Sequence, residues 1–487
     1  MMKKLLVYRL FLLLFLVHAT TVAAEQITFA SSAQSVLVCS ALPSEARGVD
    51  IAGHAPTFHS RKVEVKDGLV TIDVTPEPVW IIENTLPSVK ALTPQKSPFG
   101  MLPANADLDG SDYRYAKEIG VDWQRGGLRT PMWFTIQPDP ANALYNWDAL
   151  DRHVANLPPG MQQLQNIMVG RMPDRPAESR SPRGARNNHS IADPLTETLS
   201  RYLQGSSYRP KDPQVFEGWV RAMVERYDGD GIDDMPGLTT PVSYWQIANE
   251  PTNAPGGYEY LVELASTAIK EAAPEAKVVL GGIFLPYPAA RRYENSQLSL
   301  LENLHGNYVD IIDLHWFGEV GEWQHLPGAL ARVRSDLGKF NFRDVPIWMT
   351  EVGTYSGQPT AKRRARYASP YQSERAQADE MVKRYVIALG EGVEKIFWAW
   401  GMVEGYSDPN DNDFFDNTGL VYDGIGPQDP GKGVKKISYW SYEQMTRFLG
   451  YWDGMIPDKI ESSSDLFAYR FRYKNSDIGI VSVWSTR

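Results

Sequence analysis

The chain has 487 residues, of which 43% are hydrophobic and 22% are charged, the balance of a globular protein. Its formal net charge of −10 argues against nucleic acid or an anionic membrane as the partner. The length exceeds one ordinary domain core, although an α/β barrel with insertions reaches about 250 to more than 400 residues. We therefore expect one large domain and a small accessory domain.

Residues 1–24 have the pattern of a secretory signal peptide. Two lysines precede the apolar run 10–17, and the small residues Ala23 and Ala24 stand before the expected cleavage position. The apolar run is shorter than the roughly 20 residues that a membrane-spanning helix needs. The single cysteine, Cys39, excludes an internal disulfide, and it lies too far along the chain for a lipid anchor after the apolar run. We expect a secreted or periplasmic protein with no membrane attachment once residues 1–24 are removed.

Both ends of the mature chain are rich in predicted strands. Residues 62–74 alternate apolar and polar side chains on both sides of Asp67-Gly68, which is the signal of a tight β-hairpin. Beyond residue 450, two more alternating stretches flank a polar turn. Because the two ends of a domain often lie close together, we expect residues 25–92 and 451–487 to pair into one small β-sandwich.

Between residues 97 and 450, short apolar segments alternate with amphipathic stretches, which is typical of βα units around a parallel sheet. Eight strands are predicted, over residues 98–102, 121–126, 163–170, 242–248, 277–282, 309–315, 346–351 and 395–400. Helices are predicted over residues 213–227, 258–273, 327–337, 371–389 and 438–449. The predicted fold class is α/β, a (β/α)8 TIM barrel over 97–450 with the small β-sandwich formed by the chain ends.

Two glutamates stand at the carboxyl ends of predicted strands. Glu250 follows the fourth strand in Asn249-Glu250-Pro251, and Glu351 ends the seventh. The carboxyl ends of barrel strands meet at one face, where such barrels keep their chemistry. Two carboxyl groups flanking one bond are the minimum apparatus for cleaving a glycoside, because one protonates the leaving oxygen and the other meets the positive charge that develops on the sugar. The pair predicts a sugar hydrolase that needs no cofactor and no metal.

The same residues carry a family resemblance. Asn249-Glu250-Pro251 after strand four, with Glu351 at the end of strand seven, resembles the clan-A glycoside hydrolases, retaining β-glycosidases of (β/α)8 fold that include families 5 and 39. The resemblance covers the whole predicted barrel. It implies that Glu250 is the general acid/base, that Glu351 is the nucleophile, and that Asn249 hydrogen-bonds the 2-hydroxyl of the sugar.

The resemblance also implies a set of residues around the two glutamates. Arg125 matches the strand-two arginine that holds the nucleophile ionised, with Arg129 as its competitor, and a guanidinium there would lower the pKa of the nucleophile. His315 matches the strand-six histidine. Strand eight carries Trp398 and Trp400, one of which would stack on the sugar in the cleavage subsite, and Trp398 is preferred.

One position departs from the family pattern. Related enzymes often place a tyrosine near the strand-six histidine, where its hydroxyl bonds the nucleophile, and this chain has Phe317 there. The hydroxyl would have to come from Tyr287 or Tyr355, or be absent.

Two insertions follow predicted strands on the active face. Residues 171–194 are rich in Arg, Pro, Ser and Asn, and this composition favours a solvated loop over a lid on the substrate. Residues 407–417 are rich in Asp and Asn but lack the glycine and final glutamate of an EF-hand, so we predict no calcium site there.

The expected partner is a β-linked oligosaccharide or polysaccharide. The sequence does not distinguish cleavage within a glycan chain (endo) from cleavage at its end (exo). The shape of the substrate site, an open cleft or a closed pocket, depends on the loops. A non-catalytic glycan-binding protein on the same barrel is the alternative, since a fold does not fix a function. A metal-dependent hydrolase would require a cluster of His and Asp ligands, which the predicted strand ends do not supply.

Overall fold

The computed structural model describes residues 25–44, 56–84, 93–107, 110–126, 132–169, 198–205, 207–251, 256–288, 290–359, 369–405, 412–425, 429–450, 455–462, 465–473 and 479–486. The predicted signal peptide, the insertion 171–194 and Arg129 lie outside these ranges. None of the helices within them is long and apolar enough to cross a membrane.

Nine parallel strands form the central sheet of the described structure. Their spatial order is β10 (Lys277–Val279), β9 (Tyr244–Ile247), β8 (Gln162–Ile167), β7 (Trp123–Arg125), β6 (Phe99–Leu102), β14 (Lys395–Ala399), β13 (Ile347–Gly353), β12 (Ile312–Phe317) and β11 (Ile283–Phe284). The two outermost strands, β10 and β11, are consecutive in the sequence, and a parallel bridge joins Val279 to Ile311 just before β12. The architecture is a TIM-like α/β fold, as predicted.

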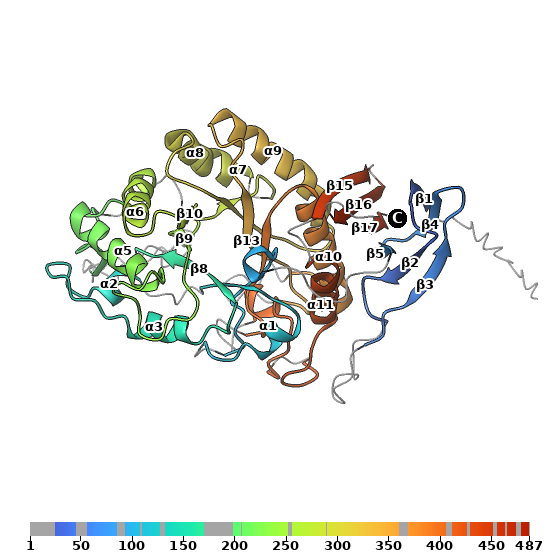
Figure 1. Cartoon of the computed structure of the whole chain (residues 1–487), viewed down its shortest axis with the longest axis horizontal. Helices are drawn as coiled ribbons and strands as arrows, with labels where there is room; N and C mark the ends of the chain where they lie inside the picture. Colours follow the sequence, from blue (N-terminus) through green and yellow to red (C-terminus); the bar gives the residue numbers. More distant parts are fainter. Residues whose placement is uncertain are drawn as a thin grey trace, which may run out of the picture.

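Helices lie around the outside of this sheet (Figure 1). They are α1 (Arg114–Glu118), α2 (Trp133–Ile136), α3 (Asp148–Ala155), α5 (Pro213–Tyr227), α6 (Tyr258–Ala272), α7 (Ala290–Arg292), α8 (Leu298–Leu304), α9 (Leu326–Lys339), α10 (Glu374–Gly390) and α11 (Ile437–Leu449). Helix α5 begins where Asp212 accepts hydrogen bonds from two backbone N–H groups of the first turn and Pro213 takes the first helical position. This local chemistry is why its predicted and observed bounds agree.

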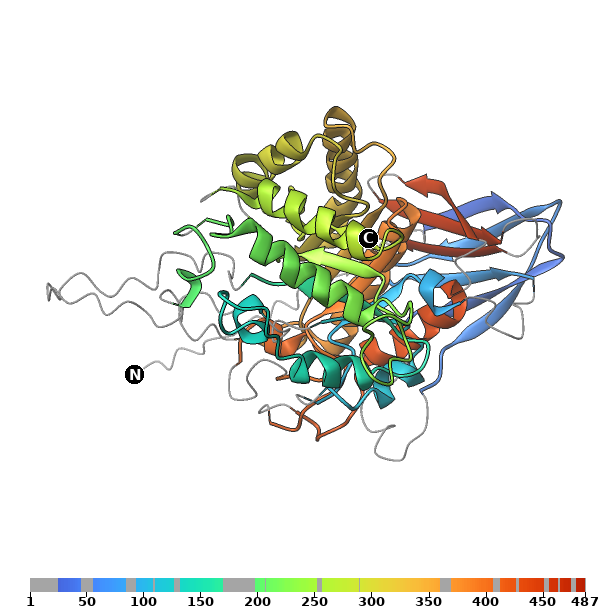
Figure 2. The same ribbon diagram turned by 60° about the vertical axis from the view of Figure 1, so that its left-hand side comes forward.

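The two ends of the chain share a six-stranded antiparallel sheet. Its order is β15 (Met455–Ser462), β16 (Leu466–Tyr473), β17 (Gly479–Ser485), β5 (Val79–Glu83), β2 (Ser35–Ser40) and β3 (Ser60–Glu64). A two-stranded sheet of β1 (Glu25–Ala30) and β4 (Leu69–Val74) packs on it through Ile27 and Ile72, which join one buried cluster with Val38 and Val481. Figures 1 and 2 both show these strands together on one side of the α/β domain.

The predicted hairpin around Asp67-Gly68 is wrong in its pairing. The tight turn is present, because Lys66 and Leu69 exchange two backbone hydrogen bonds, and Asp67 and Gly68 have positive φ of 52° and 74°. The strands then separate: β3 pairs with β2, and β4 pairs with β1 in the other sheet. Local alternation predicts the strands and the turn but cannot choose their partners.

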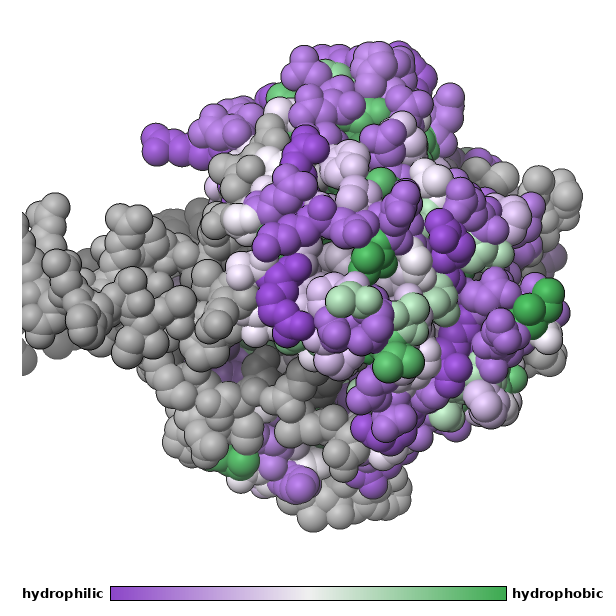
Figure 3. Space-filling view, turned by 90° about the vertical axis from the view of Figure 1, so that its left-hand side faces the viewer, coloured by the Kyte–Doolittle hydropathy of each residue, from purple (hydrophilic) through white to green (hydrophobic). Residues whose placement is uncertain are grey.

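The two antiparallel sheets formed by the chain ends pack against the α/β domain. The ring of Trp323 lies 4.9 Å from that of Phe467 and 5.7 Å from that of Trp484. Arg375 of α10 bonds both carboxylate oxygens of Glu77 and donates to a backbone carbonyl of the amino-terminal segment. Both ends of the chain therefore contact the helical layer. On the opposite side of the molecule, the described surface is mainly hydrophilic with small separate hydrophobic groups (Figure 3).

Aromatic rings line the amino-terminal end of the parallel strands. Trp123 on β7 packs against Tyr244 on β9 and Trp348 on β13, at centroid distances of 5.0 and 5.2 Å. The ammonium of Lys395 lies 4.3 Å from the Trp123 ring centroid and donates to two backbone carbonyls of the segment before β6. Burial lowers the pKa of Lys395 to about 7. The predicted site residues lie at the other, carboxyl-terminal end of the strands.

Candidate active site

Glu250 lies three residues beyond the last residue of β9, where the backbone turns out of the strand. Ala248 and Glu250 have positive φ of 60° and 44°, a region that residues other than glycine rarely adopt. The Glu250 N–H donates to the carbonyl of Gly281 over 2.5 Å, and the Tyr258 hydroxyl bridges the carbonyl of Ile247 and the N–H of Gly281. A Cβ on Gly281 would lie 2.2 Å from the Ile247 carbonyl oxygen, so only glycine allows this close approach.

Glu351 lies inside β13 at a change of register. Leu314 pairs with Met349 and His315 with Glu351, so Thr350 is an extra residue in a β-bulge, a feature that re-aims neighbouring side chains. The Glu351 side chain is only 3% exposed, whereas that of Glu250 is 15% exposed. The two predicted catalytic carboxylates therefore differ in their access to solvent.

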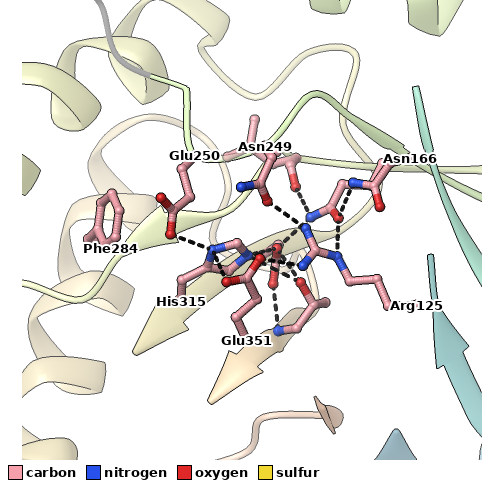
Figure 4. Close-up of polar contacts among 12 residues, drawn as sticks. Arg125, Asn166, Asn249, Glu250, Phe284, His315 and Glu351 are labelled. Atoms are coloured by element: carbon pink, nitrogen blue, oxygen red, sulfur yellow. Dashed lines mark hydrogen bonds and ion pairs between the residues drawn. The ribbon is translucent and has the colours of Figure 1, made fainter. Parts of the chain in front are cut away.

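One guanidinium holds three side chains of the site. Arg125 Nη1 donates to Glu351 Oε1 over 2.5 Å, Nη2 donates to Asn249 Oδ1 over 2.7 Å, and Nε donates to Gln246 Oε1 over 2.7 Å (Figure 4). The contact with Asn249 directs its carbonyl oxygen toward the arginine, which leaves the NH2 group on the other side. Arg125 thus lies where the sequence predicts it, beside Glu351.

The pKa of Glu351 differs from the sequence-based expectation. Burial raises it, and the positive charges of His315 and Arg125 oppose this rise without cancelling it. Arg125 lowers the pKa of Glu351, as predicted, but burial has the larger effect, because Glu351 is almost completely removed from water. Arg125 acts against burial and keeps a larger fraction of the carboxylate ionised.

His315 connects the two glutamates. Its Nδ1 lies 3.1 Å from Glu250 Oε1 and 3.6 Å from Glu351 Oε2, while its Nε2 lies 3.0 Å from Asp313 Oδ2 (Figure 4). Burial by itself lowers the pKa of His315, but the charges of Glu351 and Asp313 and the hydrogen bonds to Asp313 and Glu250 outweigh it and raise the pKa to about 10. Carboxylate oxygens of Glu250 and Glu351 and an imidazole nitrogen of His315 all lie within 4.8 Å of one another.

Trp398 on β14 and Trp400, which follows that strand, have different surroundings. Trp398 is fully buried in the main core, and its indole N–H donates to the carbonyl of Thr418 over 2.8 Å. Trp400 follows a cis peptide bond with Ala399 and lines a small cavity. The other residues of that cavity are Leu102, Arg125, Gly126, Asn166, Met168 and Asn249. The preference for Trp398 is therefore wrong, because Trp398 points into the core and Trp400 faces the site.

No tyrosine hydroxyl reaches Glu351 among the contacts of the described residues. The Tyr355 hydroxyl donates to the carbonyl of Pro370 over 2.8 Å, and the Tyr287 ring lies 3.9 Å from that of His325. Phe317 packs edge-on against the ring of Phe415 at 5.0 Å. The carboxylate of Glu351 is contacted instead by Arg125 and His315.

Four buried polar residues of the site were not predicted. Asn166 donates to Gln246 Oε1 over 2.9 Å, and Gln246 donates to Asp313 Oδ2 over 2.5 Å. Thr350 donates to both oxygens of Asp313, with its backbone N–H to Oδ1 and its hydroxyl to Oδ2. Asp313 lies two residues before His315 on the same strand face, and a polar side chain at that spacing is a signal that the sequence does contain.

Three other acidic groups have partners within the protein. In the loop 407–417, of which residues 412–417 are described, Asp413 accepts hydrogen bonds from two backbone N–H groups. Asp228, Asp230 and Asp234 lie close together, and Asp234 accepts from the backbone of its own turn. Glu404 lies close to Asp423 and Asp429 and forms an ion pair with Lys436. In each of the three groups at least one carboxylate therefore has a partner within the protein.

No protein-family model matches the sequence, and no curated protein matches it. Solved structures do resemble it. A glucosidase from Croceicoccus marinus is 16% identical with a TM-score of 0.51, and the match covers 78% of this chain and 75% of that one. A family 39 glycoside hydrolase from the gut symbiont Bacteroides cellulosilyticus WH2 is 13% identical with a TM-score of 0.53, over 95% of this chain and 87% of that one.

The chain has the fold of these two glycoside hydrolases. This likeness agrees with the clan-A resemblance of the sequence. At such low identity it concerns the fold, and any activity depends on the chemistry of this chain's own side chains. Two carboxylates, a guanidinium and an imidazole contact one another in this part of the fold, and the guanidinium and the Asn249 amide line a small cavity together with the Trp400 indole.

Proposed function

We propose that the chain is a retaining glycoside hydrolase that cleaves β-linked oligosaccharides or polysaccharides by double displacement. The observation that carries the proposal is the approach of Glu250 and Glu351, which have carboxylate oxygens within 4.8 Å of each other. Retaining enzymes hold their two carboxyl groups about 5 to 5.5 Å apart, whereas inverting enzymes need about 6.5 to 9.5 Å to admit a water molecule between the sugar and the base. An approach of the nearest oxygens to within 4.8 Å agrees with the shorter separation of a retaining pair.

The roles follow from the surroundings of the two carboxylates. Glu351 is buried and is held by Arg125, so it is oriented to attack the anomeric carbon and form a glycosyl ester. Glu250 is more exposed, so the leaving group and then water can reach it. It gives its proton to the leaving oxygen and later takes a proton from the water that hydrolyses the ester.

Two further side chains fit the sugar in the cleavage subsite. The Asn249 amide, oriented by Arg125, presents its NH2 group for the 2-hydroxyl of the substrate. The Trp400 indole lines the same cavity and offers an aromatic face to the C–H groups of the ring. Residues that only bind a glycan would give no reason for a buried charged pair at this position.

The proposal includes the finer architecture and the location of the enzyme. The Val279 to Ile311 bridge supports a closed (β/α)8 barrel in which β10 and β11 are halves of the fifth strand. The packing of the two-stranded sheet on the six-stranded sheet supports a small β-sandwich beside it. Secretion is inferred from the sequence of residues 1–24. The two similar structures are a glucosidase and a family 39 glycoside hydrolase, which supports a glycoside as the bond that is cleaved.

The stereochemistry of the first-formed product tests the proposal. We expect a panel of aryl β-glycosides to identify the sugar, and ¹H NMR recorded during its hydrolysis to show the β-anomer first, with the α-anomer appearing only by later mutarotation. Two successive inversions at the anomeric carbon give this result. Immediate release of the α-anomer would contradict the retaining mechanism, and failure to hydrolyse any glycoside would contradict the enzymatic function.

A further inference from the structure

We propose that His315, which lies between the two carboxylates, is a cation, and that Asp313 is the positioning residue that keeps it charged. A tyrosine at position 317 would contact Glu351 through its hydroxyl. This chain has Phe317 there, and the imidazolium of His315 makes the contact instead. The inference rests on the proposed hydrolase function and deepens it, because it names how this chain positions its nucleophile.

Asp313 is held as a pure acceptor. It is fully buried on β12, and four donors converge on its carboxylate. Oδ1 accepts from the backbone N–H of Thr350 over 2.8 Å. Oδ2 accepts from the Thr350 hydroxyl over 2.6 Å and from Gln246 Nε2 over 2.5 Å, and it lies 3.0 Å from His315 Nε2. An ionised carboxylate accepts hydrogen bonds only, so the histidine nitrogen that faces it must donate.

The second ring nitrogen of His315 also faces carboxylates. Its Nδ1 lies 3.1 Å from Glu250 Oε1 and 3.6 Å from Glu351 Oε2. A neutral imidazole has one donor and one acceptor nitrogen, whereas the charged ring donates from both. Glu250 carries the proton that it gives to the leaving oxygen, so the acceptor on this side of the ring is the ionised Glu351. Acceptors on both sides of the ring, Asp313 and Glu351, therefore select the imidazolium. The raised pKa of about 10 agrees with this assignment.

The ring also has little freedom to turn away. Gly282 has a positive φ of 75° and lies against the imidazole, since a Cβ there would be 2.4 Å from His315 Nε2. The charged groups that face His315 come from three strands: Asp313 on its own strand β12, Glu250 after β9, and Glu351 on β13. Arg125 on β7 contacts Glu351 from the far side, so the nucleophile lies between two cations.

The absence of a hydroxyl at position 317 makes this charge important. The Phe317 ring packs on Phe415 and supplies no donor. A tyrosine hydroxyl would orient the nucleophile at any pH below its own pKa, whereas an imidazolium does so only while it stays protonated. Asp313 therefore extends the pH range over which Glu351 has its second cationic partner.

Histidine NMR on the full chain tests the inference without any substrate. With ¹⁵N-labelled histidine, and His315→Gln to assign the signal, we expect both ring nitrogens of His315 to stay protonated up to about pH 9. In Asp313→Asn we expect the pKa of His315 to fall by at least about one to two units, because an opposite charge in contact shifts a pKa by about that amount. A wild-type His315 that is neutral at pH 7 would overturn the inference, and this measurement holds even if Asp313→Asn does not fold.

Kinetics of the same variants give a second readout. We expect Asp313→Asn to lower kcat with little change in KM, and to gain a basic limb in the pH profile that matches the new pKa of His315. Thr350→Val removes one donor to Asp313 but leaves its charge, and should keep His315 protonated. Asp336→Asn is the matched control, because Asp336 is also buried but pairs with Arg332 and Lys339 on α9.

These outcomes separate the inference from the proposed function. If Asp313→Asn leaves both the NMR titration and the pH profile unchanged, Asp313 is not the residue that holds the charge. If instead the chain hydrolyses no glycoside but His315 titrates as expected, the hydrolase function fails and the charged network stands.

Discussion

Glu351→Ala is expected to reduce kcat by about 10⁴-fold to 10⁶-fold, because the variant lacks the carboxylate that forms the glycosyl ester. Added azide should restore turnover by entering the space that the side chain leaves. Azide would then attack the anomeric carbon of a β-glycoside once, on the face opposite the leaving group. The product should be the α-glycosyl azide, which ¹H NMR identifies by its anomeric coupling.

Glu250→Ala should fail at a different step. With a leaving group that needs no proton, such as dinitrophenolate, the ester on Glu351 still forms, but its hydrolysis slows by about 10²-fold to 10⁴-fold without a general base. Azide attacks that ester in a second inversion, so the expected product is the β-glycosyl azide. Glu271→Ala is the control, because Glu271 lies on the surface beside Arg221 and should keep full activity.

The two azide products decide the roles of the pair. Opposite anomers from the two variants support Glu351 as nucleophile and Glu250 as acid/base. The same anomer from both, or a fully active Glu351→Ala enzyme, would contradict these roles.

Arg125→Met is expected to have the next largest effect, through the ionisation of Glu351. Burial already raises the pKa of Glu351, and Arg125 is one of the two cations that oppose the rise. Without the guanidinium the pKa rises further, so the acidic limb of the kcat/KM profile should move to higher pH by about one unit or more. Below that limb, kcat/KM falls about tenfold for each pH unit, because only the ionised carboxylate attacks.

The same variant should change how stability depends on pH. A carboxyl whose pKa is raised in the folded state binds more protons folded than unfolded, so its contribution to stability falls as the pH rises from the ordinary range of a glutamate through the raised pKa. We therefore expect Arg125→Met to lose most stability above that range, with part of the loss recovered in acid. Arg226→Met is the control, because it removes a comparable bidentate ion pair with Asp151 on the outer helices. In this variant the acidic limb of the kcat/KM profile should stay at the pH of the wild-type enzyme.

Much of the fold follows from local patterns in the sequence. The bounds of α5 agree with the prediction because Asp212 and Pro213 mark its start. Helix α10 begins at Glu374, three residues later than predicted, because the Ser373 hydroxyl caps it and Tyr371 stays outside. Apolar runs predict the positions of the parallel strands, because buried parallel strands are mostly continuous hydrophobic segments. The pairing of β3 and β4 with different sheets depends on contacts far along the chain, so the hairpin signal at Asp67 misleads.

The sequence predicts those residues of the site that lie near the carboxyl ends of the predicted strands. The structure brings together five predicted residues, because each lies in the carboxyl-terminal half of a parallel strand or just after one: Glu250, Glu351, Arg125, Asn249 and His315. The preference for Trp398 over Trp400 was wrong, because β14 ends at Ala399 and the direction of the Trp400 side chain depends on the loop that follows. The effect of Arg125 on the pKa of Glu351 has the predicted direction, but the larger effect of burial was not predicted, because burial at a bulge cannot be inferred from residue types.

The most direct test of the central claim is to trap the covalent intermediate. A 2-deoxy-2-fluoro-β-glycoside of the preferred sugar, with an activated leaving group, slows both steps because fluorine destabilises the positive charge at the anomeric carbon, while the good leaving group keeps the first step fast. We predict time-dependent inactivation, a mass increase of one fluoroglycosyl unit, and peptide mapping that places it on Glu351. Label on another residue, or turnover of the true substrate with no label at all, would contradict Glu351 as the nucleophile.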